Sequence, residues 1–118
     1  EARRRDDEIL LLTMAAYLPE GYTRAAFDAG QLDYGSGEVR HAAELWGAPQ
    51  QVIRGIAEHN RRTRAVASRD SDVRLVDLDR ELTAGGTNFS DICHLTRVGR
   101  QRLVDVVVPV VVELLGDR

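Results

Sequence analysis

The sequence predicts an α/β domain built on a parallel sheet, and three observations support this fold class. Two short apolar segments, at residues 9–14 and 73–78, have the composition of strands. An amphipathic segment between them, at residues 50–68, has the period of a helix. A second long apolar segment, at roughly 97–115, follows the second strand. The order strand, helix, strand, helix favours parallel strands joined by a right-handed crossover.

The first expected strand, Ile9-Leu10-Leu11-Leu12-Thr13-Met14, is a continuous apolar run of the kind found in a sheet covered on both faces. The segment that follows it, residues 15–48, has no regular period and is interrupted by glycines and prolines. We expect a long loop region there, with one or two short helices, and loops of this length are often functional. This region holds five of the six aromatic residues: Tyr17, Tyr22, Phe27, Tyr34 and Trp46.

The helix expected at residues 50–68 carries Val52 and Ile56 on one face and Glu58 and Arg61 on the other. The second expected strand, Val73-Arg74-Leu75-Val76-Asp77-Leu78, alternates at first and then meets acidic residues. We expect Asp77 and Asp79 to cap the turn after this strand rather than to bind a cation.

Thr96 is the expected N-cap of the last helix, at roughly 97–115, and Gly116 suits its C-terminal cap. The valines between Val106 and Val112 favour a strand, and Pro109 removes one helical hydrogen bond. The segment is nevertheless too long for one strand, and four apolar residues share a helical face: Leu103, Val107, Val110 and Leu114. We therefore predict a helix.

The composition bounds the class of protein. The 118 residues suit one domain, residues 1–118, and all 16 basic residues are Arg. The net charge of -3 argues against a general nucleic-acid binder. No apolar run is long enough to span a bilayer, so we expect no membrane span. Cys93 is the only cysteine, so the chain holds no internal disulfide.

The segment with the clearest chemical meaning is Phe89-Ser90-Asp91-Ile92-Cys93-His94-Leu95-Thr96. It places Asp91 three residues before His94 in a turn, where the carboxylate can reach one ring nitrogen of the imidazole. Such a contact orients the ring and stabilises the imidazolium, leaving the other nitrogen to accept a proton from a serine hydroxyl. The alternative is a local hydrogen bond that only organises the start of a helix.

In these residues the chain resembles the SGNH (GDSL-type) family of esterases and lipases. The resemblance spans residues 8–116 and runs through Asn60, the segment 73–78, and the stretch from Phe89 to Gly99. It implies a three-layer α/β/α, flavodoxin-like domain with a parallel sheet, in which residues 15–48 are the variable substrate-side loop region. It also implies that Asp91 is the acid of a catalytic triad and His94 its general base.

The chain departs from that family in one respect: the Gly-Asp-Ser-like nucleophile motif and the Gly-x-Asn-like oxyanion motif are missing. Ser90, Ser36 and Cys93 are poor substitutes by their positions in the sequence. We therefore expect this chain to be the C-terminal portion of a single SGNH-like domain whose serine lies upstream. Its substrate would be a small-molecule ester, and these 118 residues alone should be inactive.

Two other interpretations remain open: a response-regulator-like or other flavodoxin-like domain, for which Asp77 and Asp79 alone make no acidic pocket, and a binding module. The chain could be a non-catalytic α/β binding module with a structural Asp91–His94 pair and an aromatic partner surface. A zinc site is disfavoured because His41, His59 and His94 lack the spacing of metal ligands. We thus expect no cofactor. Trp46 and the tyrosines would either line a substrate pocket or cover the edge of the sheet as local core.

Overall fold

The computed structural model describes residues 7–116 and has a mixed α/β fold with one two-stranded sheet. Strand β1 (Ile9–Leu12) pairs in parallel with β2 (Val73–Val76), and Ile9 lies opposite Val73. The predicted parallel pairing is confirmed. Each strand ends two residues earlier than the apolar run suggested, at the point where the polar Thr13 follows β1 and the polar Asp77 follows β2.

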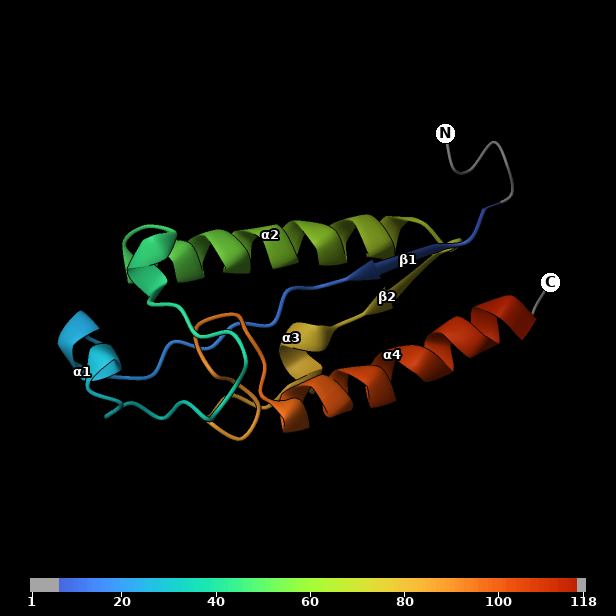
Figure 1. The fold of residues 1–118 in the computed structure, drawn as a ribbon. Helices are drawn as coiled ribbons and strands as arrows, with labels where there is room; N and C mark the ends of the chain where they lie inside the picture. Colours follow the sequence, from blue (N-terminus) through green and yellow to red (C-terminus); the bar gives the residue numbers. More distant parts are fainter. Residues whose placement is uncertain (1–6, 117–118) are drawn as a thin grey trace.

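Two long helices enclose the sheet. Helix α2 (Pro49–Arg69) and helix α4 (Arg97–Gly116) lie on opposite sides of the two strands (Figure 1). Helix α2 begins with Pro49 at its first position, where the missing N–H costs no hydrogen bond. Its amphipathic pattern is confirmed, since Val52 and Ile56 are partly buried while Arg54, Arg61 and Arg62 are exposed.

The start of α4 follows the predicted capping. The Thr96 hydroxyl accepts a hydrogen bond from the backbone N–H of Gly99 at 3.1 Å, which satisfies one free amide of the first turn. Pro109 lies inside the helix, and the valines around it are helical despite their strand preference. The length of the apolar segment therefore outweighed the propensity of its β-branched residues.

Helix α4 also exposes apolar side chains. Four of them on one side of the helix keep between 45% and 62% of their surface accessible: Val104, Val108, Val112 and Leu115. Among the helices of residues 7–116, none has the combination of length and apolar character needed to cross a membrane.

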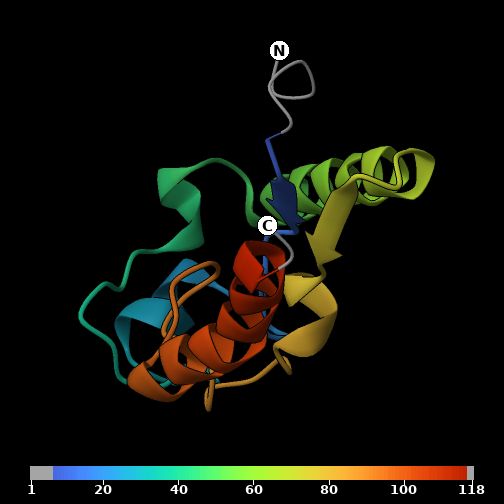
Figure 2. The same ribbon diagram turned by 90° about the vertical axis from the view of Figure 1, so that its right-hand side faces the viewer.

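Residues 15–48 form the expected loop region with two short helical turns. Helix α1 (Arg24–Asp28) is capped by Thr23, and the 3-10 helix η2 (Ala43–Leu45) precedes α2. Both lie at the end of the molecule toward which the strands point (Figure 1 and Figure 2). This arrangement brings the aromatic loop region to the carboxyl ends of the two strands.

The acidic residues after β2 form an ion-pair network with helix α2. Arg64 of α2 donates to Asp77 at 2.8 and 2.9 Å and to Asp79 at 2.9 Å. Asp77 occupies the N-cap position of helix α3 (Leu78–Glu81), as predicted, but its side chain makes no cap hydrogen bond and pairs with Arg64 instead. Arg64, together with the hydroxyl of Thr13, holds the pKa of Asp77 below its ordinary value.

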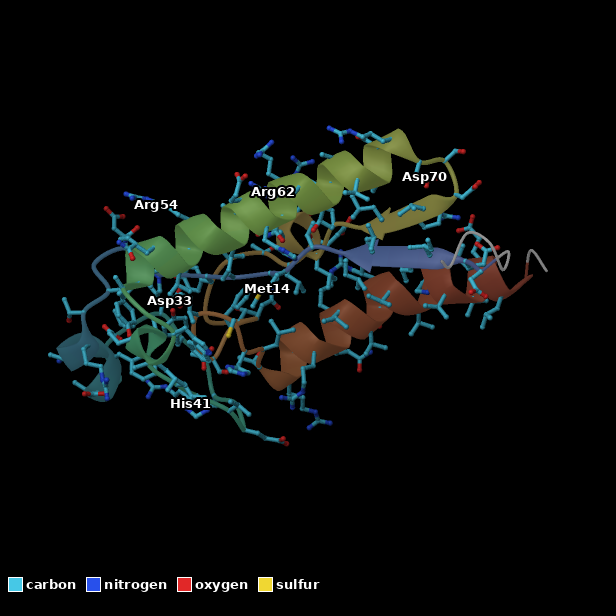
Figure 3. The ribbon with its side chains drawn as sticks, turned by 90° about the horizontal axis from the view of Figure 1, so that it is seen from above. Met14, Asp33, His41, Arg54, Arg62 and Asp70 are labelled. Carbon is cyan, nitrogen blue, oxygen red and sulfur yellow. The ribbon has the colours of Figure 1, made fainter. Side chains whose placement is uncertain are left out.

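Asn60 anchors the chain where it leaves β1. The buried Asn60 side chain accepts from the backbone N–H of Met14 at 2.7 Å and donates to the Met14 carbonyl at 2.8 Å. In Figure 3, Met14 lies on the inner side of α2, whereas Arg54 and Arg62 lie on the outer side. The amide thus replaces a strand partner and fixes Met14 beside the helix.

Candidate functional site

The turn between β2 and α4 is held closed by backbone hydrogen bonds. The N–H of Ser90 donates to the carbonyl of His94 at 2.9 Å, and Phe89 pairs with Leu95 across the turn. Phe89 and Ile92 are among the most deeply buried side chains of the described residues. This packing fixes the turn, so that Asp91 and His94 are presented in one orientation.

Asp91 and His94 form the predicted pair. Nδ1 of His94 lies 2.8 Å from Oδ2 and 3.0 Å from Oδ1 of Asp91. The Asp91 side chain is fully buried, whereas the His94 ring keeps 33% of its surface exposed. Because an ionised carboxylate can only accept, Nδ1 carries the proton and Nε2 is the basic nitrogen of the neutral ring.

Three backbone amides support the Asp91 carboxylate. Oδ1 accepts from the N–H groups of Cys93 and His94 at 2.9 and 2.7 Å, and Oδ2 accepts from the N–H of His41 at 2.7 Å. Burial acts to raise the pKa of Asp91, but these donors and the His94 ring together hold that pKa below its ordinary value. The carboxylate is therefore kept ionised beside the imidazole.

Two rings from the loop region frame the imidazole. The centroids of Trp46 and His41 lie 5.9 and 5.8 Å from that of His94, and 6.1 Å from each other. Within the described part of the chain, no side chain hydrogen bonds to Nε2 of His94. The basic nitrogen is thus available to a group that the site does not itself contain.

His94 lies between two surface hollows. One has a volume of about 410 Å³ and is lined mostly by apolar side chains: Met14, Trp46, Val52, Ile56, Ile92, Cys93 and His94. The other has a volume of about 390 Å³ and includes two charged side chains: it is lined by Glu38, Val39, His94, Leu95 and Arg100. The imidazole is part of the wall of both.

The candidate nucleophiles within the chain are occupied or poorly placed. The Ser90 hydroxyl is buried and donates to the carbonyl of Val39 at 2.8 Å. Ser36 lines a separate hollow beside Tyr34. Cys93 Sγ lies 3.7 Å from Nδ1 of His94, the nitrogen that Asp91 already engages. Burial, with the Asp91 charge, raises the pKa of the Cys93 thiol to about 11, so the reactive thiolate is scarce at neutral pH.

One cluster of possible metal ligands occurs in residues 7–116. Ligand atoms of Asp91, Cys93 and His94 lie within 4.8 Å of one another. A cation there would compete for Nδ1 of His94 and would replace its hydrogen bond to Asp91. The three backbone donors to the Asp91 carboxylate and its bond to His94 therefore suit a hydrogen-bonded pair better than a metal centre.

The aromatic residues divide between the two roles that the sequence left open. Trp46 lines the hollow beside His94, as the pocket interpretation required. The tyrosines do not line it. They pack with Phe27 and Phe89 as local core, through ring contacts of 5.6 to 6.1 Å: Tyr17–Tyr34, Tyr17–Phe89, Tyr22–Phe27 and Phe27–Tyr34.

No pattern in the sequence indicates the part that His41 plays in the site. His41 reaches the site through its backbone N–H and its ring, and 50 residues separate it from Asp91. His59 lies on α2 with an exposed side chain, apart from the other two histidines.

The comparisons with known proteins identify no relative. No family model matches the chain, and no curated protein or solved structure is significantly similar to it.

Proposed function

We propose that Asp91 and His94 are the acid and the general base of an SGNH-type serine ester hydrolase. The nucleophilic serine would come from a segment outside these 118 residues. One observation carries the proposal: a fully buried, ionised Asp91 binds Nδ1 of His94 at 2.8 Å, while Nε2 has no partner within residues 7–116 and the ring borders open hollows. This is the arrangement that a triad needs from its acid and base.

In the proposed reaction, Nε2 of His94 accepts the serine proton as the serine oxygen attacks the ester carbonyl. The imidazolium then donates that proton to the leaving alcohol as the ester C–O bond breaks. Water, deprotonated by the same nitrogen, hydrolyses the acyl-enzyme and releases the acid. Asp91 keeps the proton on Nδ1 and offsets the positive charge of the ring at each step.

The architecture is compatible with a larger three-layer, flavodoxin-like domain. The radius of gyration is 16.3 Å, whereas a compact chain of this length has about 13.5 Å. Each strand pairs on one edge only within residues 7–116, and α4 keeps an apolar side exposed. Further strands beside β1 would satisfy one free edge and cover the exposed valines.

The test uses a longer protein that contains this chain, assayed with a small chromogenic acetate ester. We expect His94→Ala to lower kcat by about three orders of magnitude or more, since the loss of a triad base has this effect. His59→Ala is the matched control because His59 is exposed on α2 and lies outside the site. Equal activity in the two variants would exclude His94 as the base.

A non-catalytic binding module is the second candidate. One observation favours it: the Asp91 carboxylate already organises the turn through the amides of His41, Cys93 and His94, which is a sufficient structural role. A fluorophosphonate probe separates the two, because it labels an activated serine. Labelling of the longer protein that is lost in His94→Ala supports the hydrolase, and no labelling of the unmodified protein supports the binding module.

A further inference from the structure

The apolar hollow beside His94 has the features of a ligand site. We propose that it binds an unbranched hydrocarbon chain, which under the proposed function is the hydrocarbon part of the ester substrate. The inference rests on that function for the identity of the ligand, but not for the chemistry of binding. Its basis is the lining of the hollow, its volume and its position against the imidazole.

The lining is suited to hydrocarbon. Val52 and Ile56 lie one turn apart on α2 and form one wall, and Met14 forms another where Asn60 fixes the chain after β1. Ile92 is almost wholly buried beneath them. The volume of about 410 Å³ falls within the range of small-molecule sites, about 300–1,000 Å³.

The rim of the hollow exposes two large apolar side chains. Met14 keeps 42% and Trp46 46% of its surface accessible, which costs hydrophobic free energy in the empty state. The Trp46 ring is held in place by ring contacts to His41 and His94. A hydrocarbon chain in the hollow would cover both side chains and would end against the imidazole.

The hollow on the other side of His94 has the opposite character. It contains Glu38 and Arg100, whose charged groups lie 4.0 Å apart at the surface. A ligand that spans the imidazole would therefore have its hydrocarbon part beside Trp46 and its polar part beside Arg100. Under the proposed function, the bond to be cleaved lies between these parts, next to Nε2 of His94.

Binding can be measured on the 118-residue chain without turnover. Trp46 is the only tryptophan, so its fluorescence reports on this hollow alone. We expect octanol to change the emission in a saturable manner. Hexanol should bind about fifteenfold more weakly, because each buried methylene contributes about a fourfold gain in affinity. A response to octanol that does not saturate, or no response, would overturn the proposal.

Two variants locate the binding. Ile56→Glu places a charge in the wall of the hollow and should abolish the octanol response, whereas Val66→Glu changes an exposed residue of the same helix and should preserve it. Val52→Phe keeps the wall apolar but fills part of the volume, and it should weaken octanol binding at least fivefold. Unchanged affinity in folded Val52→Phe and Ile56→Glu contradicts the assignment.

Ester series then separate this inference from the proposed function. In the longer protein, esters with acyl chains of increasing length and a fixed alcohol are compared with esters of a fixed acid and increasing alcohols. A rise in kcat/KM along one series identifies which part occupies the hollow. Hydrolysis without a preference in either series, together with no octanol binding, would contradict the hydrocarbon site and leave the hydrolase proposal in place. Octanol binding without hydrolysis overturns the hydrolase alone.

Discussion

The backbone N–H of His41 donates to Oδ2 of Asp91 at 2.7 Å across 50 residues of sequence. This bond ties the aromatic loop region to the turn that carries the imidazole. Trp46 follows His41 by five residues and reaches His94 from the same segment. The loop region and the Asp91–His94 pair therefore form one site. A substitution of Asp91 should alter both the loop region and the turn that carries His94.

Asp91→Asn should destabilise the fold. The variant replaces one acceptor oxygen by an NH₂ group that faces backbone donors in a fully buried position. We expect a loss of about 2 kcal/mol or more in the free energy of unfolding, measured in urea. Asp28→Asn, on the exposed surface of α1, is the control and should change it by less than about 0.5 kcal/mol.

The Asp91→Asn variant should also change how the free energy of unfolding depends on pH in the acid range. The pKa of Asp91 is lower in the folded chain, so ionisation stabilises the fold above the unfolded value of about 3.9, and this contribution is lost as pH falls through the folded pKa. The stability difference between the original chain and Asp91→Asn should thus narrow below about pH 4. A constant difference down to acid unfolding would contradict the depressed pKa.

Two glycines in helices should respond in opposite directions to alanine. A Cβ at Gly99 would overlap the backbone carbonyl of Asn88, with the carbonyl carbon only 2.9 Å away, so Gly99→Ala should cost about 1–3 kcal/mol. A Cβ at Gly55 meets nothing within 4 Å, so Gly55→Ala should stabilise by up to about 1 kcal/mol through helix propensity. Thermal unfolding of both variants checks the pair, and stabilisation by Gly99→Ala would show that the turn packs less closely on α4.

Cys93 should alkylate slowly in the folded chain. With a pKa of about 11, its thiolate at about pH 8 is roughly two orders of magnitude scarcer than that of an ordinary thiol. Mass spectrometry after timed iodoacetamide treatment should show this difference between native and urea-unfolded protein. Equal rates in the two states would mean that burial and the Asp91 charge do not suppress the thiolate.

Local sequence patterns were sufficient to predict the two strands, the two long helices and the contact between Asp91 and His94. The bounds of α2 and α4 follow from their long apolar periods and, for α4, from capping by Thr96, which acts within one helical turn. The contact between Asp91 and His94 follows from a spacing of three residues. The fold class follows because two apolar runs separated by a long helix have few ways to pair.

Other features depended on contacts that are distant in sequence. Arg64 reaches Asp77 only because α2 packs along the strands, so the local pattern predicted a capping carboxylate rather than an ion pair. Helix α3 has four residues, too few for a periodic signal. His41 and Trp46 join His94 through the path of the loop region, and no pattern in residues 15–48 encodes that path.

The proposed reaction requires that Asp91 holds the proton on Nδ1 of His94 and leaves Nε2 free to act as a base. A nitrogen–proton NMR spectrum of the histidine side chains at a pH where the ring is neutral measures this directly, with the exposed His59 as an internal reference. We expect a protonated Nδ1 and an unprotonated Nε2 for His94. A His94 ring that carries its proton on Nε2 would contradict it, because that nitrogen could not accept a proton from a serine.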